Sequence, residues 1–101
     1  MYAVIFKAKM RKVGEAVQTE YDNLAAKMRE LAKSKYGCTD FICITENKHE
    51  VAISYWNSLD DIHNWKRDVA HLAAQKLGKE QFYHSYQVQV VEVLREYQEE
   101  L

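Results

Sequence analysis

The centre of the chain reads CTDFICITENKHEVAISYW (Cys38–Trp56), and this stretch decides which fold the sequence predicts. Cys38–Glu46 and Glu50–Trp56 are rich in β-branched and aromatic residues that alternate between two faces, which predicts two strands. Asn47 and Lys48 lie between them and fit a two-residue turn, because asparagine tolerates positive φ. The stretch therefore predicts an antiparallel hairpin.

The residues before the hairpin predict one strand and one helix. Tyr2–Met10 alternates in the manner of a strand, and Arg11–Ala16 is predicted to be a loop around Gly14. Apolar residues then recur three and four positions apart over Val17–Ala32, which predicts an amphipathic helix. Gly37 follows the basic end of this segment, as expected of a glycine at a helix C-terminus.

The residues after the hairpin predict a second helix and a last strand. Ser58 is expected to cap the helix, with Asp61 in the place of the usual capping-box glutamate and Gly78 at the helix end. The expected buried stripe comprises Leu59, Ile62, Trp65, Val69, Leu72 and Ala73. One further helical turn is possible over Lys79–His84, and Tyr86–Leu94 is predicted to be a strand.

The predicted order is β-α-β-β-α-β over a single domain, residues 1–101. This order is typical of the α+β ferredoxin-like fold, a four-stranded antiparallel sheet with both helices on one face. The strands nevertheless carry apolar residues on both faces, for example Phe41 and Cys43 opposite Ile42 and Ile44. Because an exposed apolar sheet face would be a sticky patch, we expect a homodimer formed through the sheet faces.

Composition excludes several classes of protein. A net charge of −1 argues against a nucleic-acid binder or a protein of anionic membranes. We expect no membrane span and no signal peptide, because long apolar runs are missing and charge appears early in the N-terminal segment. Cys38 and Cys43 are the only cysteines. They are predicted to be free thiols on opposite faces of one strand, in a cytoplasmic protein.

Few motifs of catalysis are present. Three glycines are too few for a phosphate-binding loop, and His63 and His71 are too far apart on one helix to bind a metal by themselves, so no metal is expected. The densest segment is Trp65–Tyr86. There His71 lies near Trp65 and could be a general base or a haem ligand, or a hydrogen-bonded residue at the core boundary. The aromatic residues could equally line an apolar pocket or fill the core.

The chain resembles the antibiotic biosynthesis monooxygenase family of the dimeric α/β-barrel superfamily, over about residues 2 to 97. The first matching segments are the opening strand Tyr2–Phe6 and the strand-to-helix junction Ile53–Asp60. The other matching residues are Trp65, Ala70, His71, Ala74, Gln75, Gly78, Phe82, Tyr83, Tyr86, Val88 and Val90. The resemblance implies homodimers and a pocket between sheet and helices. It also implies oxidation of a polycyclic phenol or quinol by O₂ without metal or flavin, because such a substrate can itself reduce oxygen.

The function expected from this resemblance is a cofactor-independent monooxygenase of a small aromatic or quinol-type substrate. The candidate catalytic residues are His71, Trp65 and Tyr83, and the candidate substrate-binding residues are Trp56, Phe82 and Tyr86. One alternative is a non-catalytic, ligand-binding or stress-related dimer, and another is a haem-binding or haem-degrading monooxygenase. Two departures from the family bear on these choices. Ala52 stands where polyphenol oxygenases of the family have asparagine, and Gln75 stands where haem-degrading members have histidine.

Overall fold

The computed structural model describes residues 1–76 and 81–101, and within residues 70–76 it describes the helical backbone alone. The strands form one antiparallel sheet in the order β2-β3-β1-β4. This arrangement confirms the predicted ferredoxin-like fold. The elements, in chain order, are β1 (Tyr2–Met10), α1 (Glu15–Ser34), β2 (Asp40–Glu46), β3 (His49–Trp56), α2 (Leu59–Lys76) and β4 (Tyr83–Glu92).

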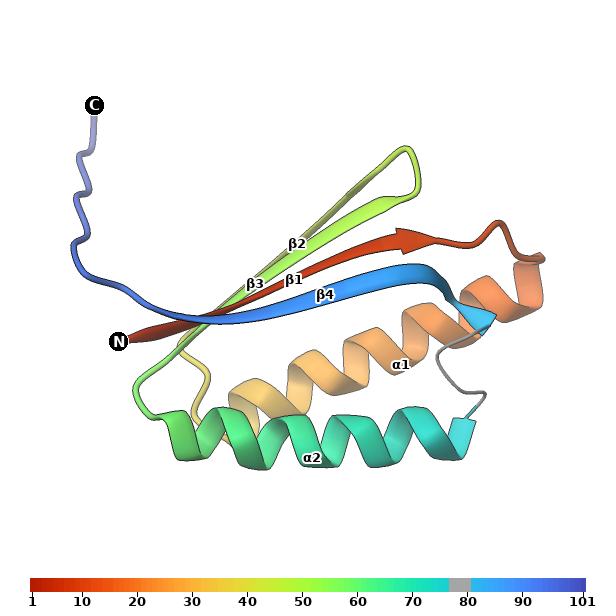
Figure 1. The fold of residues 1–101 in the computed structure, drawn as a ribbon, viewed down its shortest axis with the longest axis horizontal. Coiled ribbons are helices and arrows are strands. Elements are labelled where there is room, and N and C mark those ends of the chain that lie inside the picture. Colours follow the sequence, from red (N-terminus) through yellow and green to blue (C-terminus); the bar gives the residue numbers. More distant parts are fainter. Residues whose placement is uncertain (77–80) are drawn as a thin grey trace.

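Both helices lie on one side of the sheet, which we call its inner face (Figure 1). After β4, the chain leaves the sheet on the opposite side, and residues 94–101 are exposed. None of the helices among the described residues is long and apolar enough to cross a membrane.

The β2–β3 hairpin closes as predicted. Asn47 and Lys48 have φ values of 50° and 67°, so both residues lie in the left-handed region that a tight two-residue hairpin turn requires. The carbonyl of Lys48 also accepts a hydrogen bond of 2.7 Å from the amide of Met10, which ties the turn to the end of β1. The conformation of the turn residues and the pairing of the strands therefore specify the same hairpin.

The start of α2 is also capped as predicted. The Ser58 Oγ accepts a hydrogen bond of 3.2 Å from the amide of Asp61, and Asp60 and Asp61 place negative charge in the first turn. Ile62 and Trp65 are buried as expected. Leu59 is 52% exposed, so its place in the predicted stripe is wrong. Side chains on a helix point toward its N-terminus. At the first residue of α2, the side chain therefore extends beyond the part of the helix that packs on the sheet.

Other boundaries differ from the predictions by a few residues. Strand β2 begins at Asp40, because the Cys38 amide still bonds to the Ala32 carbonyl of α1 at 2.9 Å. Strand β4 begins at Tyr83, which pairs with Met10 across a register shift, so a helical turn reaching His84 is wrong. The predicted helix end at Gly78 lies outside the described residues.

The two cysteines are free thiols, as predicted, but they do not occupy opposite faces of one strand. Cys38 precedes β2, so strand alternation does not govern it, and its side chain packs in the core with Trp56 and Ala32. Cys43 lies within β2 on the inner face, where it lines the cavity described below.

The core of the protein has two parts. The larger comprises Val4, Ala32, Cys38, Trp56, Ile62 and Trp65. The smaller comprises Tyr21, Leu24 and Phe82, from α1 and the start of β4. Residues of both clusters line one cavity, which therefore lies between them on the inner face of the sheet.

The outer face of the sheet carries exposed apolar side chains, as the strand patterns predict. Ile42, Ile44 and Val51 are 45%, 66% and 37% exposed, respectively. Ile44 lies opposite Val51 in the β2–β3 ladder, and Ile42 lies opposite Ile53, so these side chains form a continuous strip.

Candidate functional site

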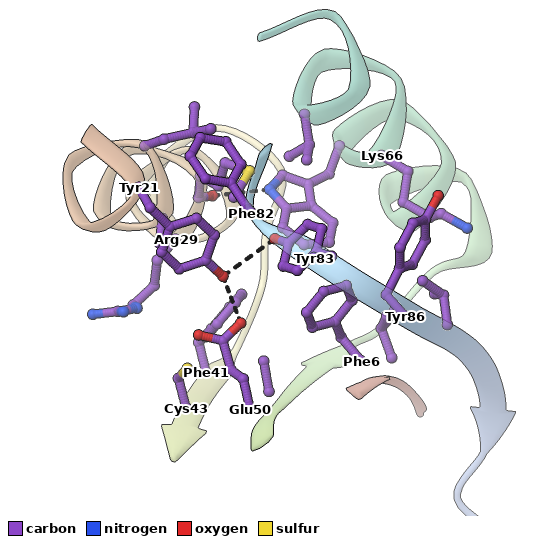
Figure 2. A pocket seen from close by; sticks show the side chains of 18 residues that line it. Phe6, Tyr21, Arg29, Phe41, Cys43, Glu50, Lys66, Phe82, Tyr83 and Tyr86 are labelled. Carbon is purple, nitrogen blue, oxygen red and sulfur yellow. Dashed lines mark hydrogen bonds between the residues drawn. The ribbon is translucent and has the colours of Figure 1, made fainter. Parts of the chain in front are cut away.

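A cavity of about 340 Å³ lies between the inner face of the sheet and the two helices. Figure 2 shows its walls. This volume is at the lower end of the range for small-molecule sites, and most of the wall is apolar, as is usual for such sites. The lining residues are Val4, Phe6, Tyr21, Leu24, Ala25, Met28, Arg29, Phe41, Cys43, Glu50, Ala52, Trp65, Lys66, Val69, Phe82, Tyr83, Tyr86 and Val88.

One chain of hydrogen-bonded polar groups crosses this apolar wall. The Tyr21 hydroxyl donates to Glu50 Oε2 at 2.6 Å, and the Tyr83 hydroxyl donates to the Tyr21 oxygen at 3.2 Å. Figure 2 shows the three groups meeting at one end of the cavity, with Tyr21 between the other two. We call this the hydroxyl chain.

Three different elements position the hydroxyl chain. Alternation along β3 turns Glu50 and Ala52 to the inner face, and Glu50 is only 8% exposed. Tyr21 comes from the buried side of α1, and Tyr83 is the first residue of β4. Burying the Glu50 carboxylate without a hydrogen bond would cost free energy. The Tyr21 hydroxyl donates that hydrogen bond.

The electrostatics of the cavity keep both tyrosines protonated near neutral pH. Burial, together with the nearby Glu50 carboxylate, raises the pKa of Tyr21 far above its ordinary value. Burial also raises the pKa of Tyr83 to about 12. Both hydroxyls therefore act as hydrogen-bonding groups with a proton in place, and Glu50 is the acidic side chain of the cavity wall.

Aromatic rings and aliphatic side chains together form most of the remaining wall. The ring of Phe6 lies 5.6 Å from that of Tyr83 and 6.0 Å from that of Tyr86, measured between centroids. On the other side, the Trp65 ring lies edge-to-face with Phe41 at 6.1 Å. These rings give the cavity flat apolar surfaces against which an aromatic ligand can stack or pack edge-to-face.

The indole N–H of Trp65 is already used within the protein. Its Nε1 donates to the Met28 carbonyl of α1 at 2.9 Å, which ties α2 to α1 across the cavity. Trp65 therefore offers a ligand its apolar ring and no hydrogen bond. Among residues 1–69 and 81–101, no group of three or more histidine, cysteine or acidic side chains is placed to hold a metal ion.

Comparison with known proteins places the chain in a family. No family model matches the sequence. The uncharacterized protein YqjZ of Bacillus subtilis is 33% identical over 96 residues, which cover 94% of this chain and 81% of YqjZ. The chain belongs to the YqjZ family. The described cavity is therefore a candidate site of a YqjZ-family protein.

Solved structures show how widely the fold of this YqjZ-family chain occurs. Rv0793 from Mycobacterium tuberculosis has a TM-score of 0.73 at 17% identity, covering 96% of this chain and 98% of Rv0793. SnoaB from Streptomyces nogalater, a cofactor-independent oxygenase, has a TM-score of 0.73 at 11% identity, with 97% of each chain covered. A structure described as an antibiotic biosynthesis monooxygenase has a TM-score of 0.71 at 13% identity, covering 94% of this chain and all of that one. These likenesses show a shared fold.

Four of the six residues selected from the sequence line the cavity of the YqjZ-family chain. Trp65, Phe82, Tyr83 and Tyr86 all contribute to its wall. The side chain of His71 lies outside the described part of the molecule, so its predicted role stays a prediction.

Trp56 does not contribute to the wall. It is completely buried, its Nε1 donates to Ser54 Oγ at 2.8 Å, and its ring packs against Trp65 at 5.1 Å. The structure therefore places Trp56 in the core and not in the cavity wall, and its role in substrate binding stays a prediction.

Sequence reasoning missed Glu50 and Tyr21. Glu50 shares the inner face of β3 with Ala52, and a carboxylate on the covered face of a strand is a signal that could have been noticed. Tyr21 belongs to the apolar stripe of α1, where a tyrosine is hard to distinguish from ordinary core.

Proposed function

We propose that this protein is a monooxygenase that binds a small aromatic phenol or quinol in the cavity and oxidises it with O₂, without a metal or organic cofactor. The observation that carries this proposal is an apolar, aromatic-walled cavity with one buried hydroxyl chain at one end. The fold is shared with SnoaB, which is described as a cofactor-independent oxygenase. A likeness of fold does not establish a reaction, so the cavity chemistry has to support it.

The cavity supplies what such a reaction requires of a protein. An aromatic substrate would lie between the rings of Phe6 and Trp65, with its hydroxyl against Tyr83. In the reaction, the phenol loses one hydrogen from a ring carbon and one from its hydroxyl, that carbon gains one oxygen atom to become a quinone carbonyl, and the second oxygen atom leaves as water. The substrate itself is thus the reductant, and the protein contributes orientation, exclusion of water and a hydrogen bond with the phenolic hydroxyl.

The direct test measures oxygen consumption with a hydroxyanthrone and with simple hydroquinones. The conditions are chosen so that all of these substrates oxidise equally fast without protein. We expect protein-dependent uptake with the hydroxyanthrone, and isotopically labelled O₂ should place one labelled atom in the quinone formed from it. Tyr83→Phe should lower kcat by about tenfold to a hundredfold, the scale of one hydrogen bond lost in a buried site. Tyr97→Phe is the matched control, because Tyr97 is 84% exposed in the C-terminal segment.

The alternative functions give different results in the same experiments. Saturable binding of the phenol without oxygen uptake would identify a non-catalytic ligand-binding protein and refute the proposed reaction. A Soret band with one haem per chain, formed on titration with haem, would favour the haem-binding alternative.

The proposal includes a homodimer that covers the outer face of the sheet. Ile42, Ile44 and Val51 form an exposed apolar strip there, and burying such a strip is the usual source of stability in an obligate dimer. Sedimentation at micromolar concentration should give twice the chain mass, and Ile44→Lys should shift the protein toward monomer. Wild-type protein that sediments as a monomer would refute the dimer.

A further inference from the structure

We infer that Glu50 fixes the direction of the hydroxyl chain, so that the cavity selects ligands that donate a hydrogen bond to Tyr83 and discriminates against ligands that can only accept one. The inference rests on the proposed function, since it takes the cavity as the site of an aromatic ligand. It assigns a specificity-determining role to Glu50 and Tyr21, although Tyr83 is the member of the chain that meets the ligand.

The direction follows from the number of protons available. A carboxylate only accepts hydrogen bonds, and a tyrosine hydroxyl has one proton to donate. At 2.6 Å, the proton of Tyr21 is committed to Glu50 Oε2. The contact of 3.2 Å between the two hydroxyls must then use the proton of Tyr83. Each proton of the chain therefore points toward Glu50.

The cavity consequently meets the ligand with an acceptor. With its proton donated to Tyr21, the oxygen of Tyr83 can form a further hydrogen bond only with a donor, such as a phenolic hydroxyl. A carbonyl or an ether at the same place would set two acceptors against each other and lose the hydrogen bond. The buried charge of Glu50 behind the two tyrosines also favours a neutral ligand over a phenolate at this end.

The other polar groups of the cavity wall do not reverse this preference. The wall includes two basic residues, Arg29 of α1 and Lys66 of α2, and the side chains of both are exposed to solvent. In Figure 2 the guanidinium of Arg29 points away from the hydroxyl chain, and the hydroxyl of Tyr86, which also lines the cavity, points away from that chain beside Lys66. Cys43 also lines the cavity, as a neutral thiol that donates only weakly.

The experiment compares α-naphthol with α-tetralone by isothermal titration calorimetry. The two molecules share a bicyclic skeleton, and they place a hydroxyl donor or a carbonyl acceptor at the same carbon. We expect wild-type protein to bind α-naphthol about 10- to 100-fold more tightly, the effect of one hydrogen bond made or left unmade in a buried site. Equal affinities would overturn the inference, and so would the absence of binding for both probes.

Two variants test the direction of the chain. In Tyr83→Phe the preference for α-naphthol should fall to about threefold or less, because the acceptor is gone. Glu50→Gln should reduce the preference to a similar level, because an amide can donate as well as accept and lets each hydroxyl turn around. Affinities that fall together while their ratio stays at the wild-type value would reveal a merely structural role for Glu50 and overturn the inference. Tyr97→Phe and Glu96→Gln, both in the exposed C-terminal segment, should keep the wild-type ratio.

Oxygen uptake by the same samples separates this inference from the proposed reaction. If the affinity ratios behave as expected and no phenol is oxidised, the directed hydroxyl chain stands and the monooxygenase proposal fails. If a phenol is oxidised and wild-type protein does not distinguish α-naphthol from α-tetralone, the reaction stands and the role of Glu50 is refuted.

Discussion

The buried hydroxyl chain should make the folded protein lose stability above pH 10. The pKa of Tyr83 is about 12 in the folded protein and 10.0 in an ordinary tyrosine. Between these values the unfolded chain releases the proton of Tyr83 while the folded protein retains it. Because the unfolded state then binds fewer protons, rising pH favours unfolding. The stability that depends on the protonated hydroxyl is complete below pH 10 and is lost as the pH rises toward 12.

The size of the effect follows from the separation of the two values. A shift of one pKa unit is worth at most about 1.4 kcal/mol, and because both states titrate gradually, Tyr83 alone should lower the free energy of unfolding by roughly 2 kcal/mol between pH 10 and pH 12. Burial raises the pKa of Tyr21 still further, so Tyr21 should add a comparable loss over the same interval. The free energy of unfolding of a small domain is only about 5–15 kcal/mol in total, so the loss of stability at alkaline pH should be easy to detect.

The assay is urea unfolding followed by circular dichroism at several pH values, at one protein concentration, for wild type and Tyr83→Phe. Phenylalanine cannot ionise, so the difference in unfolding free energy between the two proteins should shift by about 2 kcal/mol in favour of the variant between pH 9 and pH 12. Tyr97→Phe, in which an 84% exposed ring is changed, should follow wild type throughout. If Tyr83→Phe also stays parallel to wild type, Tyr83 ionises equally in both states and the description of the hydroxyl chain is wrong.

Three further predictions concern contacts of the helices and of the β2–β3 turn. Each is measured by urea unfolding at neutral pH. Trp65→Phe should cost roughly 2 kcal/mol, because the Met28 carbonyl loses its 2.9 Å donor and a smaller ring leaves a void; an unchanged midpoint would contradict that contact. Ser58→Ala should cost about 1 kcal/mol by removing the cap on the Asp61 amide, whereas Ser58→Asp should retain most of the stability. Lys48→Gly should stabilise the protein by about 0.5 kcal/mol, since glycine adopts a φ of 67° without strain; a loss of stability would refute this account of the turn.

The features that were predictable from the sequence are those determined by neighbouring residues. The Asn47-Lys48 turn and the Ser58 cap both depend on the conformational preferences of a few adjacent positions, and both occur as predicted. The paired strands follow from alternation, which also sets the register once one face is buried. The element order then leaves few topologies open, so the fold could be predicted with little more than periodicity.

The hydroxyl chain could not be predicted in this way. It joins Tyr21 of α1, Glu50 of β3 and Tyr83 of β4, and each residue has an ordinary explanation in its own element. Their meeting depends on the register of β4 against β1, including the irregularity between Lys9 and Met10 that lets the strand begin at Tyr83. Trp56 was selected on a family pattern, whereas packing places it in the core against Trp65, outside the cavity wall.

The position of the polar group on β3 departs from what the resemblance seen in the sequence implies. That resemblance implies an asparagine where this chain has Ala52, and Ala52 contributes only a methyl group to the cavity wall. The polar group here is Glu50, one inner-face position earlier on the same strand, and inner-face positions are about 7 Å apart. The hydrogen-bonding end of the cavity therefore lies nearer the β2–β3 turn. Because Glu50 bears a charge that an asparagine lacks, it needs the Tyr21 hydroxyl beside it, and that requirement gives the chain its direction.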